Sequence, residues 1–387
     1  MFQWTKCRSV VAVGALALLG LAPAQAQRVK VGDERPYEVA TSAYPRGAAN
    51  RPVTWSETIV SPGATFLRVH FEKLNLPDGD YITVSSPDSD EFWTYTGKGP
   101  RGTGEFWSFA VEADVAVVEL HSGSQKRGAR FGVSIDRIAH GTAPMWEDNG
   151  PAPWVICGTN GSRNAVCHTS VNARPVARLS FQSGGSSFVC TGWLVAGPNS
   201  STMLTNNHCF DTQSETNTVQ ARFNYQTTTC TGTTIASFTT YAGGTFLRTS
   251  ASLDYTLITL QGNPEATWGE YTATTKTPTV GMAINFPQHP GGGVKKIGFW
   301  KDSAQTLRCD VAGANVSISG YSSGSQMTYS CDSEGGSSGS PIMDAGTGRI
   351  VGLHHLGGVG GGTCLNSATQ LKNVCPNAGS LLSCASN

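Results

Sequence analysis

Residues 334–341 read EGGSSGSP, and the choice of the central serine in this string decides the fold. With Ser337 at the centre, the string fits Gly-x-Ser-x-Gly, the strained strand–turn–helix elbow that presents a nucleophilic serine on an α/β sheet. With Ser338 at the centre, it fits Gly-x-Ser-Gly-x-Pro, a pattern found around a nucleophilic serine in all-β proteins. A third interpretation is a flexible Gly/Ser-rich loop without chemistry. The rest of the chain must distinguish these three interpretations.

The composition favours short strands and limits the classes of partner. The chain has 387 residues, enough for two or three domains. Charged residues make up only 14%, and the 27 basic and 27 acidic residues cancel. Such a chain lacks the electrostatic footprint of a protein that binds nucleic acid or acidic membranes, so neither partner is expected. The 46 glycines favour strands joined by tight turns, and an all-β protein is predicted.

The first 26 residues have the features of a secretory signal peptide. Lys6 and Arg8 give a positively charged start, residues 9–22 form an uncharged apolar run, and residues 24–26 (Ala-Gln-Ala) offer a small-residue cleavage site. The apolar run is too short for a membrane anchor, and no other stretch has that length. We therefore expect a secreted protein, extracellular or periplasmic.

The cysteines agree with export. One of the eleven, Cys7, lies in the predicted signal. The other ten cysteines are an even number, which predicts disulfide bonds in an exported chain. Neither a CxxC pair nor a His-x3-His set is present, so no metal site and no cofactor are expected. All ten follow residue 150: Cys157, Cys167, Cys190, Cys209, Cys230, Cys309, Cys331, Cys364, Cys375 and Cys384.

The distribution of cysteines and strand-like runs predicts two β-rich domains. Residues 27–62 are polar with scattered prolines and are expected to be irregular. Residues 63–140 contain several short alternating runs, such as TFLRVHFEKL and VAVVELHS, which predict a β-sandwich. Residues 141–153 are rich in proline and glycine and predict a linker. Residues 154–387 continue the strand pattern and predict a second all-β domain of the barrel or sandwich type.

A serine nucleophile needs a base within hydrogen-bond reach and a third group that orients the base. His208 in TNNHC and Asp254 in LDYTLITL are the candidates. A disulfide between Cys190 and Cys209 would hold the loop that carries His208. On their own, a histidine beside a cysteine and an aspartate at a strand start are more often structural.

The order of these residues separates the interpretations of the opening string. An elbow requires a following helix, with the acid and the histidine both downstream of the serine. No amphipathic helix pattern follows Pro341, and the downstream Asp344 lies too close in sequence to His354 or His355. The order His208, Asp254, Ser338 is instead that of chymotrypsin-like enzymes. Ser338 is therefore the predicted nucleophile, and the N–H groups of Gly336 and Ser338 are the predicted oxyanion hole.

Taken together, TNNHC, DYTL and GGSSGSP resemble the bacterial trypsin-like serine proteases of the chymotrypsin fold, most closely the lysyl endopeptidase group. Four further segments resemble that group: CTGWLV (190–195), FNYQTTTC (223–230), INFPQHPGGGVKKI (284–297) and RIVGLHHLGG (349–358). The resemblance covers roughly residues 155–364, and the β-rich residues 65–140 resemble the pro-domain that precedes such proteases.

The resemblance implies a double β-barrel protease domain over residues 154–387, made as a zymogen behind a β-sandwich pro-domain. It implies a secreted serine endopeptidase, expected to be a monomer, that acts on polypeptides with His208 as general base, Asp254 as its orienter and Ser338 as nucleophile. The disulfides that it implies are Cys157–Cys364, Cys167–Cys230 and Cys190–Cys209, which leaves Cys309–Cys331 and Cys375–Cys384.

The residues that select the substrate depart from this pattern. Lysyl endopeptidases carry a specificity aspartate in the segment that LNSATQLKNVC (365–375) matches, and no acid is present there. Asp332 lies six residues before Ser338, the trypsin offset for a pocket that binds a basic residue. His354 falls where glutamyl-specific relatives place a carboxylate-binding histidine, and His355 adjoins it. We expect cleavage after Lys or Arg. Cleavage after Glu, or a catalytically silent homologue that acts as a binding protein, remain alternatives.

Ser337 also bears on activation. Animal chymotrypsin-like enzymes have an aspartate just before the nucleophile, and it pairs with a newly freed N-terminus. A serine cannot form that ion pair, so activation by this salt bridge is not expected.

Overall fold

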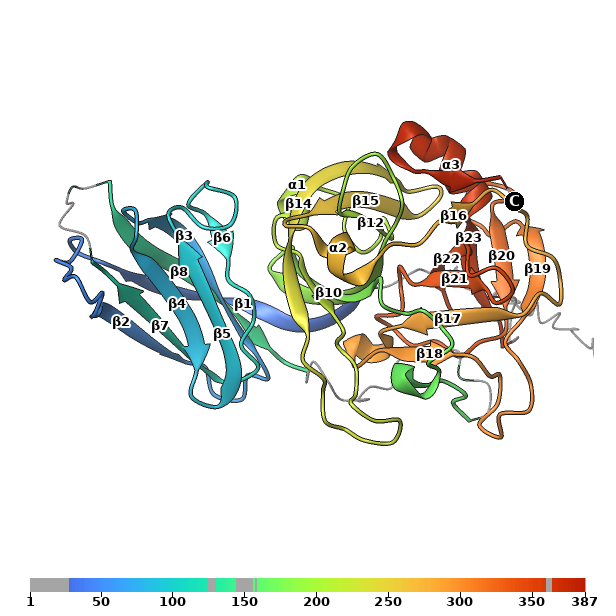
Figure 1. Ribbon diagram of the computed structural model, residues 1–387, viewed down its shortest axis with the longest axis horizontal. Coiled ribbons are helices and arrows are strands. Elements are labelled where there is room, and N and C mark those ends of the chain that lie inside the picture. The colour runs from blue at the N-terminus through green and yellow to red at the C-terminus, as the bar shows by residue number, and fades with distance from the viewer. Residues whose placement is uncertain are drawn as a thin grey trace, which may run out of the picture.

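The computed structural model describes residues 28–123, 128, 130–143, 156, 159–359 and 364–386. The predicted signal peptide and most of the predicted linker lie outside these residues. The protein is mostly β, as predicted, with an N-terminal sandwich lobe beside a two-barrel lobe (Figure 1). Among the described helices, none combines the length and the apolar character that a membrane span needs.

Two sheets face each other in the N-terminal lobe and bury a shared apolar core. That core contains Ile59 and Val118 from one sheet and Val69, Phe71 and Ile135 from the other. In spatial order, the first sheet has β1 (Val29–Ala40), β8 (Gly132–Gly141), β3 (Leu67–Asn75) and β6 (Phe106–Trp107), and the second has β2 (Val53–Val60), β7 (Val115–His121), β4 (Tyr81–Ser86) and β5 (Ser89–Thr96).

The prediction that residues 27–62 are irregular was wrong, because they form β1 and β2. Two features hide β1 in the sequence. Its pairing registers shift near Gly32 and Pro36, and each shift interrupts the alternation of inward and outward side chains. Proline is tolerated in strands at such irregular positions. Tertiary pairing with β8 and with β11 (Ser186–Leu194) therefore decides the structure here, and the sandwich begins well before residue 63.

The first barrel is a closed ring of six antiparallel strands. β10 pairs with both β13 and β11, so the sheet returns to its starting strand. β11 additionally pairs with β1, which joins the barrel to the sandwich in one continuous sheet. The ring runs through β10 (Val176–Ser183), β13 (Gln220–Phe223), β14 (Thr239–Ser250), β15 (Tyr255–Leu260), β12 (Thr202–Thr205) and β11 (Ser186–Leu194).

The second barrel is closed by a short bridge between Ala283 and Asp310. Its strands in spatial order are β19 (Val311–Val316), β20 (Gln326–Tyr329), β23 (Asn366–Gln370), β22 (Ile350–Leu356), β21 (Pro341–Asp344) and β17 (Ile284–Gln288), extended by β18 (Lys296–Gly298) and β9 (Arg163–Asn164). Short elements complete the lobe: β16 (Ala273–Thr274), β24 (Cys384–Ala385), α1 (Gln213–Thr216), α2 (Pro264–Trp268), α3 (Leu371–Ala378), and the 3-10 turns η1 (Ala165–Cys167), η2 (Pro290–Gly292) and η3 (Gly379–Leu381).

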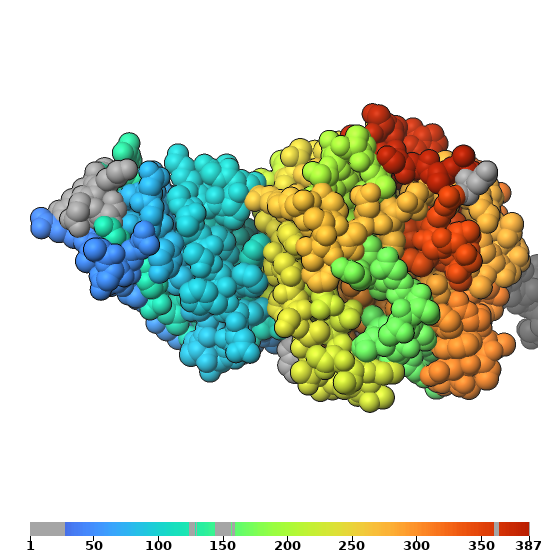
Figure 2. Space-filling view, viewed as in Figure 1, coloured from blue at the N-terminus to red at the C-terminus, as the bar shows by residue number. Residues whose placement is uncertain are grey.

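One apolar cluster joins the two barrels, with Trp193 and Leu204 from the first and Met343 and Leu353 from the second. This packing fixes the loops of one barrel against those of the other. In Figure 2 the sandwich (blue to cyan) abuts the first barrel (yellow), while the second barrel (orange to red) lies at the opposite end.

Candidate active site

His208 lies just after β12, on a loop that is fastened at its next residue. Cys209 forms a disulfide with Cys190 of β11, as the resemblance implied. The His208 backbone N–H donates to Asp254 Oδ1 over 2.9 Å, and its ring Nδ1 lies 2.8 Å from Asp254 Oδ2. The ring is therefore held by Asp254 with Nε2 directed away. Nε2 is buried and has no hydrogen-bond partner within the described residues.

Asp254 occupies the turn that leads into β15 and has a positive φ of 48°, a conformation that costs energy for a residue with a Cβ. Asn206 stabilises this turn by donating from Nδ2 to the Asp254 carbonyl over 2.7 Å. The carboxylate is buried, and burial alone would raise its pKa. The charge of His208 and hydrogen bonds from His208 and His355 outweigh burial and hold the pKa of Asp254 well below its usual range. Asp254 therefore stays ionised.

Ser338 is tied to both of these residues through the backbone. Its carbonyl accepts from the Thr191 N–H over 2.8 Å, and Thr191 adjoins Cys190 of the disulfide beside His208. The N–H of Gly339, the residue after Ser338, donates over 2.9 Å to the carbonyl of His354. His354 is followed directly by His355, whose ring contacts Asp254. These bonds bring the predicted nucleophile, base and orienter to the same junction of the two barrels.

The turn around Ser338 depends on two glycines. Gly336 has φ +84°, and a Cβ there would lie 2.6 Å from the backbone nitrogen of Gly292. Gly339 has φ +89°, and a Cβ there would lie 2.0 Å from the Thr191 carbonyl oxygen. Within the described residues, neither the Gly336 N–H nor the Ser338 N–H donates to a protein acceptor. Two N–H groups in one turn are thus available to an oxyanion.

His355 was expected from sequence to bind substrate, and the structure places it behind Asp254 with both ring nitrogens close to protein groups. Its Nδ1 is 3.1 Å from Asp254 Oδ2, and its Nε2 is 2.7 Å from Gln326 Oε1. The Tyr321 ring packs edge-on against it, with centroids 4.5 Å apart. Burial lowers the pKa of His355, while Asp254 opposes that shift. His355 therefore acts on the same carboxylate as His208.

His354 points into the second barrel. Its Nδ1 lies 2.6 Å from the Tyr329 hydroxyl, and its ring packs on Phe286. Burial, followed by the nearby His355 and His208, lowers the pKa of His354 to about 3. Burial therefore favours the neutral form of the ring.

Asp332 is buried beside the segment that precedes η1. Its Oδ2 accepts from the Gly161 N–H over 2.6 Å, and its carbonyl accepts from Gln288 Nε2 over 2.9 Å. Ser337 is also buried, and its hydroxyl donates to Gln288 Oε1 over 2.6 Å. The structure thus gives Ser337 a structural partner, unlike Ser338, whose hydroxyl has no such bond among the described residues.

Four disulfides join the cysteine pairs expected from sequence: Cys167–Cys230, Cys190–Cys209, Cys309–Cys331 and Cys375–Cys384. The fifth expected pair, Cys157–Cys364, involves Cys157, which lies outside the described residues. Among the described residues, one cluster of potential metal ligands is present, formed by Cys190, His208 and Cys209, but its two sulfurs are bonded to each other. This cluster therefore cannot supply two thiolate ligands.

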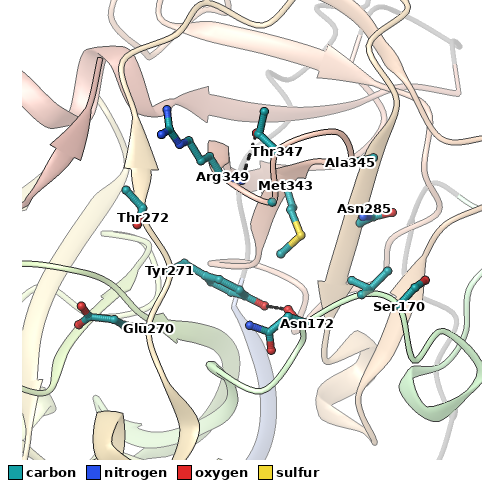
Figure 3. Close-up of a pocket in the computed structure, with 12 residues that line it drawn as sticks. Ser170, Asn172, Glu270, Tyr271, Thr272, Asn285, Met343, Ala345, Thr347 and Arg349 are labelled. Carbon is teal, nitrogen blue, oxygen red and sulfur yellow. Dashed lines mark hydrogen bonds between the residues drawn. The ribbon is translucent and has the colours of Figure 1, made fainter. Parts of the chain in front are cut away.

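A cavity of about 470 Å³ lies beside the second barrel, where residues 170–172 and 270–272 meet β17 and β21 (Figure 3). It is lined by Tyr271, whose hydroxyl donates to the Asn172 carbonyl, and by Met343 and Arg349 among others. None of the predicted site residues lines it. The chemistry suggested by the sequence is therefore not located in this cavity.

Sequence reasoning missed two residues that shape the site. Asn206 holds the Asp254 turn through its bond to the Asp254 carbonyl. Thr191 connects β11 to the Ser338 turn by two bonds: its N–H donates to the Ser338 carbonyl, and its Oγ1 donates over 2.8 Å to the Gly336 carbonyl. Asn206 lies two residues before His208, so its place in TNNHC was the available signal. Thr191 gives no such signal, because its role depends on the contact between the barrels.

A family model described as "Lysyl endopeptidase, C-terminal domain" matches residues 156–374. A lysyl endopeptidase of Pseudomonas aeruginosa is 26% identical over 297 residues, covering 72% of this chain and 61% of its own length. Secreted RxLR effector protein 73 of Plasmopara viticola is 29% identical over 330 residues, covering 79% of this chain and 77% of its own.

Two solved structures are more distantly similar. A Glu endopeptidase is 22% identical with a TM-score of 0.41, covering 58% of this chain and 97% of its own. The active form of the Rv3671c protease of M. tuberculosis is 13% identical with a TM-score of 0.41, covering 62% of this chain and 96% of its own.

Proposed function

The chain belongs to the lysyl endopeptidase C-terminal domain family, and on that premise we propose that it is a secreted serine endopeptidase with His208, Asp254 and Ser338 as its catalytic triad. The observation that carries the proposal is the pair of hydrogen bonds that Asp254 accepts from His208. The Ser338 turn is bonded to β11, the strand whose disulfide holds the His208 loop. The substrates of such an enzyme are polypeptides.

In this proposal His208 Nε2 takes the proton of the Ser338 hydroxyl while Oγ attacks a peptide carbonyl. Asp254 stays ionised and stabilises the imidazolium that forms. The N–H groups of Gly336 and Ser338 donate to the oxyanion of the tetrahedral intermediate. His208 then protonates the leaving amine, and water hydrolyses the acyl-enzyme by the same steps. The absence of a bond from Nε2 to Ser338 is compatible with this, because catalytic hydrogen bonds are often long before substrate binds.

For the residue before the scissile bond, the proposal is Lys or Arg, with Asp332 as the acidic group. His354 argues against the glutamyl alternative, because its ring is buried in the second barrel and its Nδ1 lies 2.6 Å from the Tyr329 hydroxyl. Digestion of a denatured protein mixture and sequencing of the products tests this. Cuts that follow Lys and Arg are expected, and cuts that follow Glu would refute the assignment of Asp332.

Export is supported by the signal-like start, by the four disulfides and by the relative named as a secreted effector. The test is to express the full chain in a secreting host and to determine the N-terminus of the protein in the medium. The secreted precursor is expected to start close to residue 27 if residues 1–26 are the signal, whereas a form that has lost the pro-domain would start after the sandwich.

The activity is tested with a serine-directed phosphonate and a set of fluorogenic peptides. The wild type should be labelled and should cleave peptides, whereas Ser338→Ala should do neither. The effector-named relative favours a second candidate, a silent homologue that binds other proteins without cleaving them. A folded wild type that resists labelling and leaves all peptides intact would establish that alternative.

A further inference from the structure

Arg28, the residue before β1, is held beside the loop that carries the proposed base. We propose that Glu215, the Phe188 ring and the Cys209 carbonyl form a cation-binding subsite that selects a basic residue directly after the scissile bond. In the precursor, Arg28 fills this subsite. The inference rests on the proposed function. It agrees with the resemblance of the sandwich to a pro-domain, because removal of that domain would free the subsite for substrate.

Three groups of the first barrel surround the Arg28 guanidinium. Its Nη1 donates to the Cys209 carbonyl over 3.0 Å and lies 3.3 Å from Glu215 Oε1. Its guanidinium carbon lies 4.3 Å from the centre of the Phe188 ring. A carboxylate, a carbonyl and an aromatic face all attract a cation, and none of them donates a hydrogen bond to an anion. Because Cys209 follows His208 directly, the bound cation lies next to the loop of the base.

Glu215 is fixed by the barrel and does not depend on Arg28 for its position. Its Oε2 accepts from the Asp211 N–H over 3.1 Å and from the Thr212 hydroxyl over 2.8 Å. Burial would raise the pKa of Glu215, but hydrogen bonds, led by that from Ser183, outweigh it and lower the pKa. The carboxylate therefore stays charged, with Oε1 directed at the subsite, when Arg28 leaves.

β1 approaches Ser338 along one edge of β11, as Figure 1 shows for the strand that runs from the sandwich to the first barrel. The Thr191 N–H donates to the Ser338 carbonyl, and two residues earlier Val189 pairs with Val29. Peptide groups two residues apart in an antiparallel strand point to the same edge, so the Ser338 turn and β1 share this edge. The pairing is antiparallel, and the N-terminal end of β1 lies nearest to Ser338.

The register of this pairing assigns a substrate position to Arg28. Val29 lies opposite Val189, and two further residues along β11 lead to Thr191, where the Ser338 turn is bound. A substrate chain in the place of β1 therefore has the attacked carbonyl at the level of Thr191. The residue in the place of Arg28 is then the first after the scissile bond. Main-chain pairing along the edge supplies affinity, and the subsite supplies side-chain selection.

β1 and a substrate segment that follows the scissile bond cannot occupy this edge of β11 together. Val189 is fully buried and packs in one apolar cluster with Val31 and Phe66 of the sandwich. With the sandwich in place, the edge is thus closed to a polypeptide that extends past the scissile bond. Loss of the sandwich would open the edge and leave the charged Glu215 beside it.

The subsite is tested with two peptides that differ only in the residue directly after the scissile bond, Arg or Gln. Both carry, before the bond, the residue that the protein digestion identifies. The full chain is expressed in a secreting host, the secreted enzyme is titrated with the phosphonate, and the products are identified by mass. Because Arg gains an ion pair with a half-buried carboxylate, its kcat/KM should be about fivefold higher than that of Gln. In Glu215→Gln this ratio should fall below about twofold.

Glu265→Gln is the matched control. It makes the same substitution on α2 of the same lobe, where Glu265 Oε2 accepts from the Ser201 hydroxyl over 2.6 Å. Its ratio should equal that of wild type, and a ratio that stays at the wild-type value in Glu215→Gln would overturn the inference. If Glu215→Gln does not fold, Phe188→Leu is measured. Its ratio should fall to about half because the aromatic face is lost, and an unchanged ratio would overturn the inference.

Occupation of the subsite by Arg28 is tested on the full-length chain in a Ser338→Ala background, which prevents turnover. Binding of the Arg peptide is measured by fluorescence anisotropy, and thermal unfolding is followed in each variant. Arg28→Ala should strengthen binding about fivefold, because the peptide must displace β1 and the ion pair that holds it is lost. Arg35→Ala, in β1 but bonded to Ser61 of the sandwich, should leave binding unchanged. Unchanged binding in Arg28→Ala, or an equal gain in Arg35→Ala, would overturn the inference.

Failure of this inference can be distinguished from failure of the proposed function. A wild type that cleaves both peptides with equal kcat/KM would overturn the inference and leave the proposed function intact. A wild type that neither reacts with the phosphonate nor cleaves any peptide would remove both.

Discussion

Replacing Asp254 by Asn removes one charge from the most constrained residue of the proposed triad. The carboxylate binds the His208 N–H at 2.9 Å, the His208 Nδ1 at 2.8 Å and the His355 Nδ1 at 3.1 Å. An amide of the same shape has one oxygen and one nitrogen, so its nitrogen must face a ring nitrogen. If His208 presents a lone pair at Nδ1, its proton lies on Nε2, and the ring can no longer accept the proton of Ser338.

The expected loss follows from this change of tautomer. In a triad whose geometry is kept, the wrong tautomer costs about 10⁴-fold in kcat, which is about 5.4 kcal/mol of activation free energy. Stability should fall by about 2 kcal/mol, since one hydrogen bond to a charged group is lost. Because the pKa of Asp254 is held below its unfolded value of about 3.9, the wild-type advantage is complete above pH 4 and is lost as the pH falls further.

Both quantities are measured on purified full-length protein, with kcat from a fluorogenic peptide and free energies of unfolding from urea titrations at pH 7 and pH 3. Asp344→Asn is the control, because it makes the same substitution at another buried aspartate, which pairs with Lys276. It should leave kcat unchanged. The reasoning is refuted if folded Asp254→Asn keeps more than a tenth of the wild-type kcat, or if its stability deficit is as large at pH 3 as at pH 7.

Three further predictions concern single residues. Ser337→Ala should keep kcat near wild type. It should lose about 1 to 3 kcal/mol of stability in urea unfolding, because the buried Gln288 Oε1 loses its donor. An inactive Ser337→Ala would contradict the choice of Ser338 as the nucleophile. Gly339→Ala should lose about 3 kcal/mol or more by the same measurement, because its Cβ would meet the Thr191 carbonyl at 2.0 Å, and an unchanged stability would contradict this packing. Burial lowers the pKa of Lys295 to about 7, so between pH 7 and 10 this side chain is neutral in the folded protein and takes up a proton on unfolding. The free energy of unfolding should therefore rise with pH across that range in wild type and rise less steeply in Lys295→Met. Equal slopes for the two proteins would contradict the assignment.

The proposed triad could be predicted from sequence because it depends on chemistry and order. A nucleophilic serine needs a base and an orienter, and His208, Asp254 and Ser338 occur in the order found in chymotrypsin-like enzymes. The four disulfides of the described residues were also expected. These features are local strings with a chemical reason for their composition.

The rest depended on tertiary packing. The adjacent His354 and His355 look equivalent in sequence, yet they point to opposite sides of β22, so that one meets Tyr329 and the other Asp254. β1 was missed because its irregular alternation is compensated by pairing on both of its edges. Neither outcome follows from a local pattern, because each depends on how distant strands meet.

The sheet shared by β1 and β11 also has a consequence for biosynthesis. β1 is synthesised before β11, so a sandwich that folds before the barrel has β1 paired to β8 and its other edge open. That edge is an aggregation hazard until residues 186–189 are made, and it is also a template on which the first barrel strand can align. The pairing of β1 with β11 therefore does two things at once: it covers an exposed sheet edge of the sandwich and aligns a strand of the first barrel.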